Sequence, residues 1–290
     1  GSVDYAFKIT RSEISLGEYF EFFSTFSTVS AALDEALHPA SGALRINPYY
    51  AGPGNQYHLN PSDPHAVSRP ISVSRNAAMM YANWLHNGKS SDPTDLLDGA
   101  YDFNSAPGGV PITHEPDARY RLPTLDEHMK AAYYDPDKNG NGPGWWRYSN
   151  QSDEPSAPGT PDVGAHPYGL SDAELEAIYG AGETNPSQLP LGVYDGPQSQ
   201  SHYGLIDLLT GRSEVMSELE YVLGEEYWLQ TVVFRNAWGW QSPLDGQGIT
   251  GSPNSDTPFY GFRLVVVPSP GGGAIAVLGS ATFLGRRRRS

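Results

Sequence analysis

The sequence YGLIDLLTGRSEVMSE, from Tyr203 to Glu218, decides the fold of this chain. It begins with an aromatic residue and a glycine, continues as a short apolar run that contains Asp207, and breaks at Thr210-Gly211 before the carboxylate of Glu214. A second aromatic-glycine sequence, Tyr260-Gly261-Phe262-Arg263, follows later in the chain. Glycine beside an aromatic residue is typical of a turn that is anchored on a core. The first stretch therefore predicts a turn, and the second echoes it in the closing part of the core.

Composition indicates a loop-rich globular protein. The 290 residues suffice for one large or two small domains with a sizeable core. The 32 glycines and 25 prolines are too few to indicate disorder. A net charge of −15 disfavours binding to nucleic acid and favours cations such as calcium. The absence of cysteine excludes disulfides, thiolate nucleophiles and cysteine-bound metals.

Regular elements are predicted near both ends of the chain. A strand is expected over residues 7–10, and Ser15 is expected to cap a helix whose apolar face repeats at three- and four-residue steps. That face consists of Leu16, Tyr19, Phe20, Phe23 and Phe26. A second helix is expected over residues 75–86, and the last two core strands over residues 232–240 and 260–267.

The segments between these elements are rich in glycine and proline. Residues 40–70 are predicted to form an ordered loop, and residues 98–116 a hairpin that turns at Pro107-Gly108-Gly109. Residues 155–191 are predicted to be an insertion that holds one short helix, over 171–179.

The stretch YRLPT, from Tyr120 to Thr124, has the most specific local signal in the chain. Thr124 is expected to cap a helix, and Glu127, three residues later, to complete a capping box. His128 follows on this helix and is interpreted as a packed or surface histidine rather than a metal ligand.

A run of oxygen-bearing side chains follows that helix. Asp135, Asp137, Asn139 and Asn141 alternate with other residues, and glycines allow sharp turning. Carboxylate and amide oxygens in this spacing suit a hard cation such as calcium. A twelfth-position glutamate is absent, because Trp146 stands there, so an EF-hand is not expected. Calcium binding and a solvated turn remain the two interpretations.

The C-terminal residues form a separate segment, residues 268–290. Pro268 and Pro270 precede a small-residue apolar run over 271–285, and the run ends in Arg286, Arg287, Arg288 and Arg289. About fifteen apolar residues are short for a stable transmembrane helix, and a terminal cluster of arginines favours the cytoplasmic side. This segment predicts transient membrane association.

The motifs together resemble the formylglycine-generating-enzyme (sulfatase-modifying-factor) family. YGLIDLLTGRSEVMSE, RNAW and YGFR are similar to the family's YGLYDMSGNVWEW, RGGSW and GFR, and YRLPT is similar to its YRLPTE. The likeness spans residues 5–267, with the insertion at about 155–191, and leaves residues 1–4 as an N-terminal end from which a leader is expected to have been removed. The matched motif positions are Thr124, Glu127, Asp207, Arg235 and Arg263. The resemblance implies an α+β fold, an elaborated C-type-lectin-like fold that is loop-rich with little regular secondary structure.

The resemblance also bears on chemistry. Catalytic members use two cysteines that bind copper, and the corresponding positions here fall near Trp240 and Asp245. Because Cu(I) needs soft ligands, we expect neither copper nor formylglycine generation. The family's calcium-binding Asn and Glu correspond to Gly211 and Glu214, so Glu214 is either a calcium ligand or the partner of Arg212 or Arg263.

The tail is similar to a PEP-CTERM sorting signal, with Pro-Ser-Pro, residues 268–270, in place of Pro-Glu-Pro. This resemblance implies an exosortase-type sorting enzyme as a partner. It also implies an exported bacterial protein that is placed at the cell surface, in the envelope or in the extracellular matrix.

Three functions are consistent with these features. We expect a non-catalytic binding or display module for an unknown glycan, peptide or matrix ligand and not for nucleic acid. Trp228, Trp238, Trp240 and Asp245 are its candidate ligand-binding residues, although core packing is the alternative role of each tryptophan. The other two functions are a metal-dependent oxidase or oxygenase of the same superfamily and a self-assembling surface subunit.

Calcium binding leads to a direct prediction. Elemental analysis of the purified protein should detect calcium, and chelation should remove it and lower the melting temperature, because bound metal stabilises the folded state. Stoichiometric iron or copper would contradict a structural cation and point to an oxidase.

Overall fold

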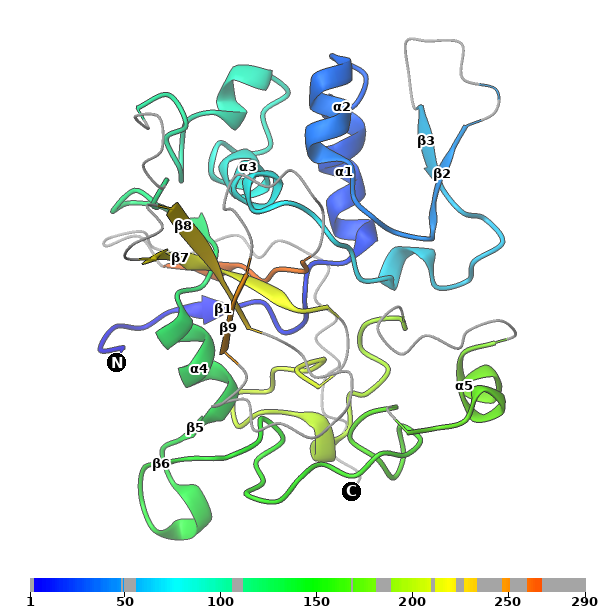
Figure 1. The fold of residues 1–290 in the computed structure, drawn as a ribbon, viewed down its shortest axis with the longest axis vertical. Helices are drawn as coiled ribbons and strands as arrows, with labels where there is room; N and C mark the ends of the chain where they lie inside the picture. The colour runs from blue at the N-terminus through cyan, green and yellow to red at the C-terminus, as the bar shows by residue number, and fades with distance from the viewer. Residues whose placement is uncertain are drawn as a thin grey trace, which may run out of the picture.

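Short sheets and long connecting loops make up an α+β architecture in the computed structural model, as the sequence predicts (Figure 1). The structure describes residues 3–47, 49, 56–105, 112–167, 169–180, 189–209, 212–222, 227–233, 247–250 and 260–267.

The helices follow the order of the chain. They are α1 (Leu16–Phe26), α2 (Ala31–Leu37), α3 (Arg75–His86), α4 (Leu125–Tyr133) and α5 (Asp172–Tyr179). Short 3-10 turns accompany them: η1 (Ala66–Ser68), η2 (Pro93–Leu96), η3 (Lys138–Gly140) and η5 (Pro197–Ser199).

The strands form small sheets. Strands β1 (Lys8–Ile9), β10 (Val265–Val266) and β4 (Tyr120–Arg121) make an antiparallel sheet with β10 in the centre. Two hairpins pair β2 (Leu44–Ile46) with β3 (Tyr57–Leu59) and β5 (Tyr134–Asp135) with β6 (Gly144–Trp145). The fourth sheet has the order β7 (Glu214–Val222), β8 (Tyr227–Val233), β9 (Gln247–Thr250).

Polar caps define where the predicted helices begin. The Oγ atoms of Ser15 and Ser171 and the Oγ1 of Thr124 each accept a hydrogen bond from the third helical residue, whose glutamate side chain bonds back to the cap. Ser74 caps α3 in the same way through the backbone N–H of Ala77. These caps satisfy N–H groups that otherwise lack partners at a helix start. The predicted capping box of Thr124 and Glu127 is confirmed.

Aromatic side chains of α1 and α3 fill the core. The rings of Phe22 and Trp84 have centroids 5.4 Å apart, and Tyr81 lies 5.6 Å from Phe262 of the closing motif. All four side chains are buried. Edge and tilted contacts of this kind add to the free energy gained by removing the rings from water. The apolar face predicted after Ser15 therefore packs as expected, although Phe22 contributes more than Phe20, which is only half-buried.

A fully buried ion pair joins the stretch from Tyr203 to Glu218 to the second aromatic-glycine motif, Tyr260 to Arg263. The Nε of Arg263 lies 3.0 Å from Oε1 and 3.1 Å from Oε2 of Glu214, and neither side chain is exposed. Burial lowers the pKa of Arg263 to about 10, so the guanidinium stays charged at neutral pH. Arg263 is thus confirmed as one of the two partners expected for Glu214. The Nδ1 of buried His128 lies 3.7 Å from Oε2 of the same carboxylate, a proximity that the sequence did not indicate.

A second buried pair supports α4. Arg121 donates two hydrogen bonds of 2.6 Å to the carboxylate of Glu127, and the hydroxyl of Tyr5 donates a third, of 2.8 Å. Burial alone would raise the pKa of Glu127, but the bonds from Arg121 and from the backbone of Thr124 outweigh it, and the net pKa lies below its usual range. Glu127 therefore holds the helix cap and the N-terminal segment together.

Some sequence predictions need correction. Residues 40–70 contain the β2–β3 hairpin and η1 rather than only loop, and α2 was not anticipated. The strand expected over 232–240 begins earlier, at Tyr227, because it pairs with β7, and its residues 234–240 lie outside the described residues. Of the hairpin expected over 98–116, the structure describes one antiparallel bridge, between Tyr101 and His114, and the expected turn lies outside the described residues.

We predict that Glu214→Gln lowers the free energy of unfolding by about 3–5 kcal/mol, because it leaves the buried charge of Arg263 without its counterion. Glu127→Ala should also lower the free energy of unfolding, because it leaves the buried charge of Arg121 without its counterion. Urea unfolding measures both changes. The matched control is Glu35→Gln on the exposed surface of α2, where the change should stay within about 0.5 kcal/mol. Equal stability of Glu214→Gln and the control would contradict the structural role of the pair.

Candidate functional site

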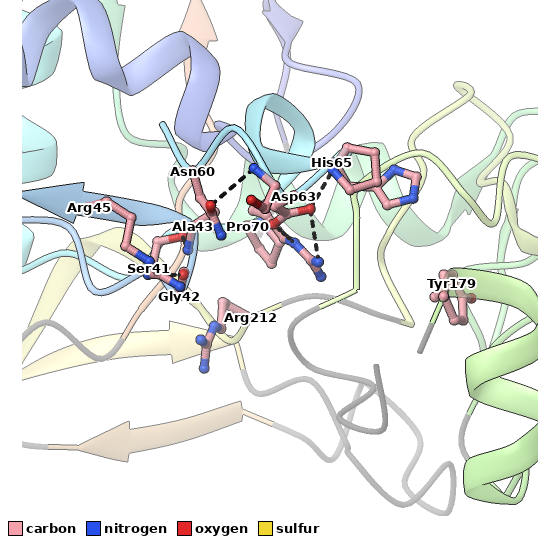
Figure 2. Close-up of a pocket in the computed structure, with 14 residues that line it drawn as sticks. Ser41, Gly42, Ala43, Arg45, Asn60, Asp63, His65, Pro70, Tyr179 and Arg212 are labelled. Atoms are coloured by element: carbon pink, nitrogen blue, oxygen red, sulfur yellow. Dashed lines mark hydrogen bonds and ion pairs between the residues drawn. The ribbon is translucent and has the colours of Figure 1, made fainter. Parts of the chain in front are cut away.

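A polar pocket of about 490 Å³ lies between the loops around the β2–β3 hairpin, the end of α5 and the start of β7 (Figure 2). Its charged and hydrogen-bonding side chains come from Ser41, Arg45, Asn60, Ser62, Asp63, His65, Arg69, Tyr179 and Arg212. We call it the arginine pocket.

One wall of the arginine pocket is built by side chains that bond to their own turns. The Oδ1 of Asn60 accepts the backbone N–H of Ser62 at 3.1 Å, and the Oδ1 of Asp63 accepts that of His65 at 2.9 Å. Asn and Asp favour such turns because their short side chains reach the backbone two residues on. The turns lead directly into η1 and fix the wall.

Asp63 also holds Arg69 in a two-pronged ion pair, drawn as dashed lines in Figure 2. The Nε of Arg69 lies 2.8 Å from Oδ2, and Nη2 lies 3.2 Å from Oδ1. Burial would raise the pKa of Asp63, but the bonds from Arg69 and from the backbone of His65 outweigh it, and the net pKa lies below 3.8. Asp63 is therefore an ionised partner of Arg69 at neutral pH.

Two further arginines line the arginine pocket. Arg45 is exposed and donates to the carbonyl oxygens of Gly42 and Leu44. Arg212 is half-buried, and its backbone N–H donates to Oε1 of Glu13 at 3.0 Å. Among the residues that the structure describes, the lining thus has three arginines and one carboxylate, on a chain with a net charge of −15. The excess of guanidinium groups favours an anionic ligand.

The far side of the arginine pocket comes from α5, within the predicted insertion. Tyr179 is buried, and burial together with its interaction with Tyr194 raises the pKa of its hydroxyl. The phenol is therefore neutral at physiological pH and acts as a hydrogen-bonding and packing group.

The structure places the expected calcium loop at the β5–β6 hairpin. Asp135 accepts hydrogen bonds from the backbone of Asp137 at 2.8 Å and from Nε1 of Trp146 at 3.1 Å, and Nδ1 of His202 lies 3.2 Å from its Oδ1. Asn139 has a positive φ of 57°, as the sharp turn requires. Within the described ranges, no three His, Cys, Asp or Glu side chains gather as a metal site. Calcium at Asp135, Asp137, Asn139 and Asn141 stays a prediction, and Glu214 is engaged with Arg263.

Several candidate residues fall where the structure gives no side-chain description. Trp228 lies in β8 opposite Tyr221, and only this backbone pairing is described. The others lie outside the described residues: Arg235, Trp238, Trp240, Asp245, Pro268, Pro270, Arg286, Arg287, Arg288 and Arg289. In the part of the chain that is described, no helix is long and apolar enough to cross a membrane.

The arginine pocket was not found from the sequence. Its residues are spread from Ser41 to Arg212, and only Arg212 had been singled out, as a possible partner of Glu214. The one available signal was Asn60 to Asp63, a turn-forming run that precedes an arginine.

Comparisons with known proteins support the fold. No protein-family model and no curated protein matches this sequence. Among solved structures, the chain is similar to CarF, with a TM-score of 0.53 and 22% sequence identity over 92% of this chain and 91% of that one. At this identity the likeness indicates a related fold and carries no function.

We predict that Asp63→Asn lowers the free energy of unfolding at pH 7 by about 1–3 kcal/mol, because Arg69 loses its charged acceptor. The folded-state pKa of Asp63 is depressed, so this stabilisation is present above pH 3.8 and is lost as the pH falls through the folded-state value. The difference in free energy of unfolding between the wild type and Asp63→Asn should therefore shrink as the pH is lowered from 7 to 2.5. Asp98→Asn serves as control, because Asp98 is exposed. An equal loss of stability in this control at pH 7 would argue against a specific contribution of the pair between Asp63 and Arg69.

Proposed function

We propose that this chain is an exported, surface-displayed binding protein, without catalytic activity, built on a fold of the formylglycine-generating-enzyme type. The observation that carries the proposal is the concentration of three arginines against one carboxylate in the described lining of a pocket of about 490 Å³, on an otherwise acidic chain. We assign the arginine pocket as the site of an oxyanion group, a carboxylate or sulfate, of a surface glycan or peptide.

Guanidinium geometry supports an oxyanion ligand. Arginine presents planar, divergent N–H donors that match the two oxygens of a carboxylate or a pair of sulfate oxygens. Asp63 already satisfies Arg69, so Arg69 shapes the wall while Arg45 and Arg212 supply the excess charge. The hydroxyls of Ser41 and Ser62 add neutral donors and acceptors around the anion.

The chemistry of the site favours binding over catalysis. Asp63 has a depressed pKa and a tight ion pair, so it is a weak proton acceptor at neutral pH. The chain has no cysteine, and the family's thiol-dependent oxidation therefore has no nucleophile here.

Sorting to the surface is proposed from the tail. Pro268 and Pro270, the apolar run and the arginines 286–289 give the layout of a signal read by an exosortase-type enzyme, with transient membrane association before processing. The expected location is the cell surface, envelope or extracellular matrix, and calcium is the expected stabilising ion.

We predict that isothermal titration calorimetry detects binding of sulfate or glucuronate to the protein. Arg45→Gln and Arg212→Gln should each weaken it about tenfold or more, since each removes a charge-assisted hydrogen bond. Arg147→Gln is the matched control, because Arg147 is an exposed arginine outside the arginine pocket.

Equal affinities for wild type and the two pocket variants would contradict the assignment of the site. Absence of any oxyanion binding by the wild type would overturn the proposal itself.

A further inference from the structure

A second pocket, of about 590 Å³, is lined by residues of the N-terminal segment, of α4 and of the 203–205 turn. Figure 1 shows that the N-terminal segment passes beside α4. The aromatic and charged side chains of this pocket come from Tyr5, Phe7, Lys8, Arg11, Lys130 and Tyr203 among the described residues. We call it the tyrosine groove. Among the described lining residues, none is shared with the arginine pocket.

Tyr5 presents an exposed ring on a fixed support. The residue is 45% exposed, yet its hydroxyl donates a 2.8 Å hydrogen bond to Glu127, which is itself locked to Arg121 in the buried pair. Phe7 meets the Tyr5 ring edge-on at 6.2 Å. An aromatic ring that is held at its polar end and open on its side loses little entropy when a ligand stacks on it.

Tyr203 presents a second exposed ring at the same groove. It is 49% exposed, and the ring of His202 packs edge-on against it at 5.0 Å. His202 is in turn held by Asp135, 3.2 Å from its Nδ1. The adjacent Gly204 has a positive φ of 81°, which lets the turn project Tyr203 outward. Core packing explains an aromatic residue that is buried. A ligand explains two aromatic rings that are held in place and exposed at one groove.

The charged side chains in the described lining of the groove are all cationic. Lys8, Arg11 and Lys130 line the groove, and the described lining contains no Asp or Glu. Arg11 pairs with Asp195, and Lys130 donates to the carbonyl oxygen of Val3. Lys8 is exposed and forms no ion pair with any residue that the structure describes. Its ammonium group is therefore available to an anion.

We infer that the tyrosine groove binds an acidic oligosaccharide, one whose sugar rings carry carboxylates. The apolar faces of pyranose rings fit the open faces of Tyr5 and Tyr203, and the carboxylates pair with Lys8. Charge complementarity favours this occupant, because the described lining of the groove is cationic on a chain whose net charge is −15. The inference stands independently of the arginine pocket.

The test compares trigalacturonate with its methyl ester, which keeps the sugar rings and removes the charges. Titration calorimetry with the full chain should show binding of trigalacturonate at least about tenfold tighter than of the ester. Tyr203→Ala should weaken both ligands about tenfold, because it removes one stacking face. Lys8→Gln should weaken only the charged ligand and so reduce the difference between the two.

Matched controls are Tyr49→Ala, which removes a tyrosine that is 90% exposed elsewhere, and Lys89→Gln. Neither should change the affinity. The inference is overturned if wild type binds neither ligand, if the ester binds as tightly as the acid, or if the controls lose as much as the groove variants.

The arginine-pocket variants Arg45→Gln and Arg212→Gln separate the two sites. Loss of trigalacturonate binding in these variants with full binding in Tyr203→Ala would move the sugar to the arginine pocket and refute the groove. Retention of trigalacturonate binding in them supports the groove, even if the arginine pocket itself fails to bind oxyanions.

Discussion

The ion pair between Arg263 and Glu214 determines how the separate parts of the chain come together. Beyond the carboxylate, the guanidinium of Arg263 donates to the carbonyl oxygens of Thr10, Arg11 and Ile206. A guanidinium can make several bonds in one plane, so one side chain joins the N-terminal segment, the 203–209 turn and the closing motif. The same arrangement positions both pockets. Arg11 and the 203–205 turn, which Arg263 joins, border the tyrosine groove. Arg212, which lines the arginine pocket, lies two residues before Glu214 in the sequence.

Close approach of the buried Glu13 side chain explains why a glycine suits position 261 of the closing motif. Gly261 bridges Glu214 in parallel, and its Cα faces the carboxylate of Glu13, where any β-carbon would collide. Glu13 in turn accepts the backbone N–H of Arg212. The aromatic-glycine pair at Tyr260-Gly261 thus has two separate roles, because Tyr260 bridges Val73 while Gly261 allows three chain segments to meet.

Elements with local signals could be predicted from sequence, and elements with distant partners could not. The capping box at Thr124 depends on residues three apart, so its spacing identifies it, whereas at Ser15 the sequence predicted the cap but not the glutamate that bonds back to it. The β2–β3 hairpin has three-residue strands, too short for a readable alternation. The arginine pocket could not be predicted from the sequence for a related reason. Its residues come from segments that only the tertiary fold brings together. His128 shows the same limit, because its proximity to Glu214 crosses from α4 to β7.

The central place of β10 in the first sheet constrains the order in which the protein can fold. β10 separates β1 from β4, and the hydrogen bond from Arg263 to Thr10 spans 253 residues. The N-terminal strand consequently has no sheet neighbour until nearly the whole domain has been made, and loops of this length close slowly. The domain therefore reaches its final state only after synthesis has passed the closing motif, and until then the buried carboxylate of Glu214 remains open to water.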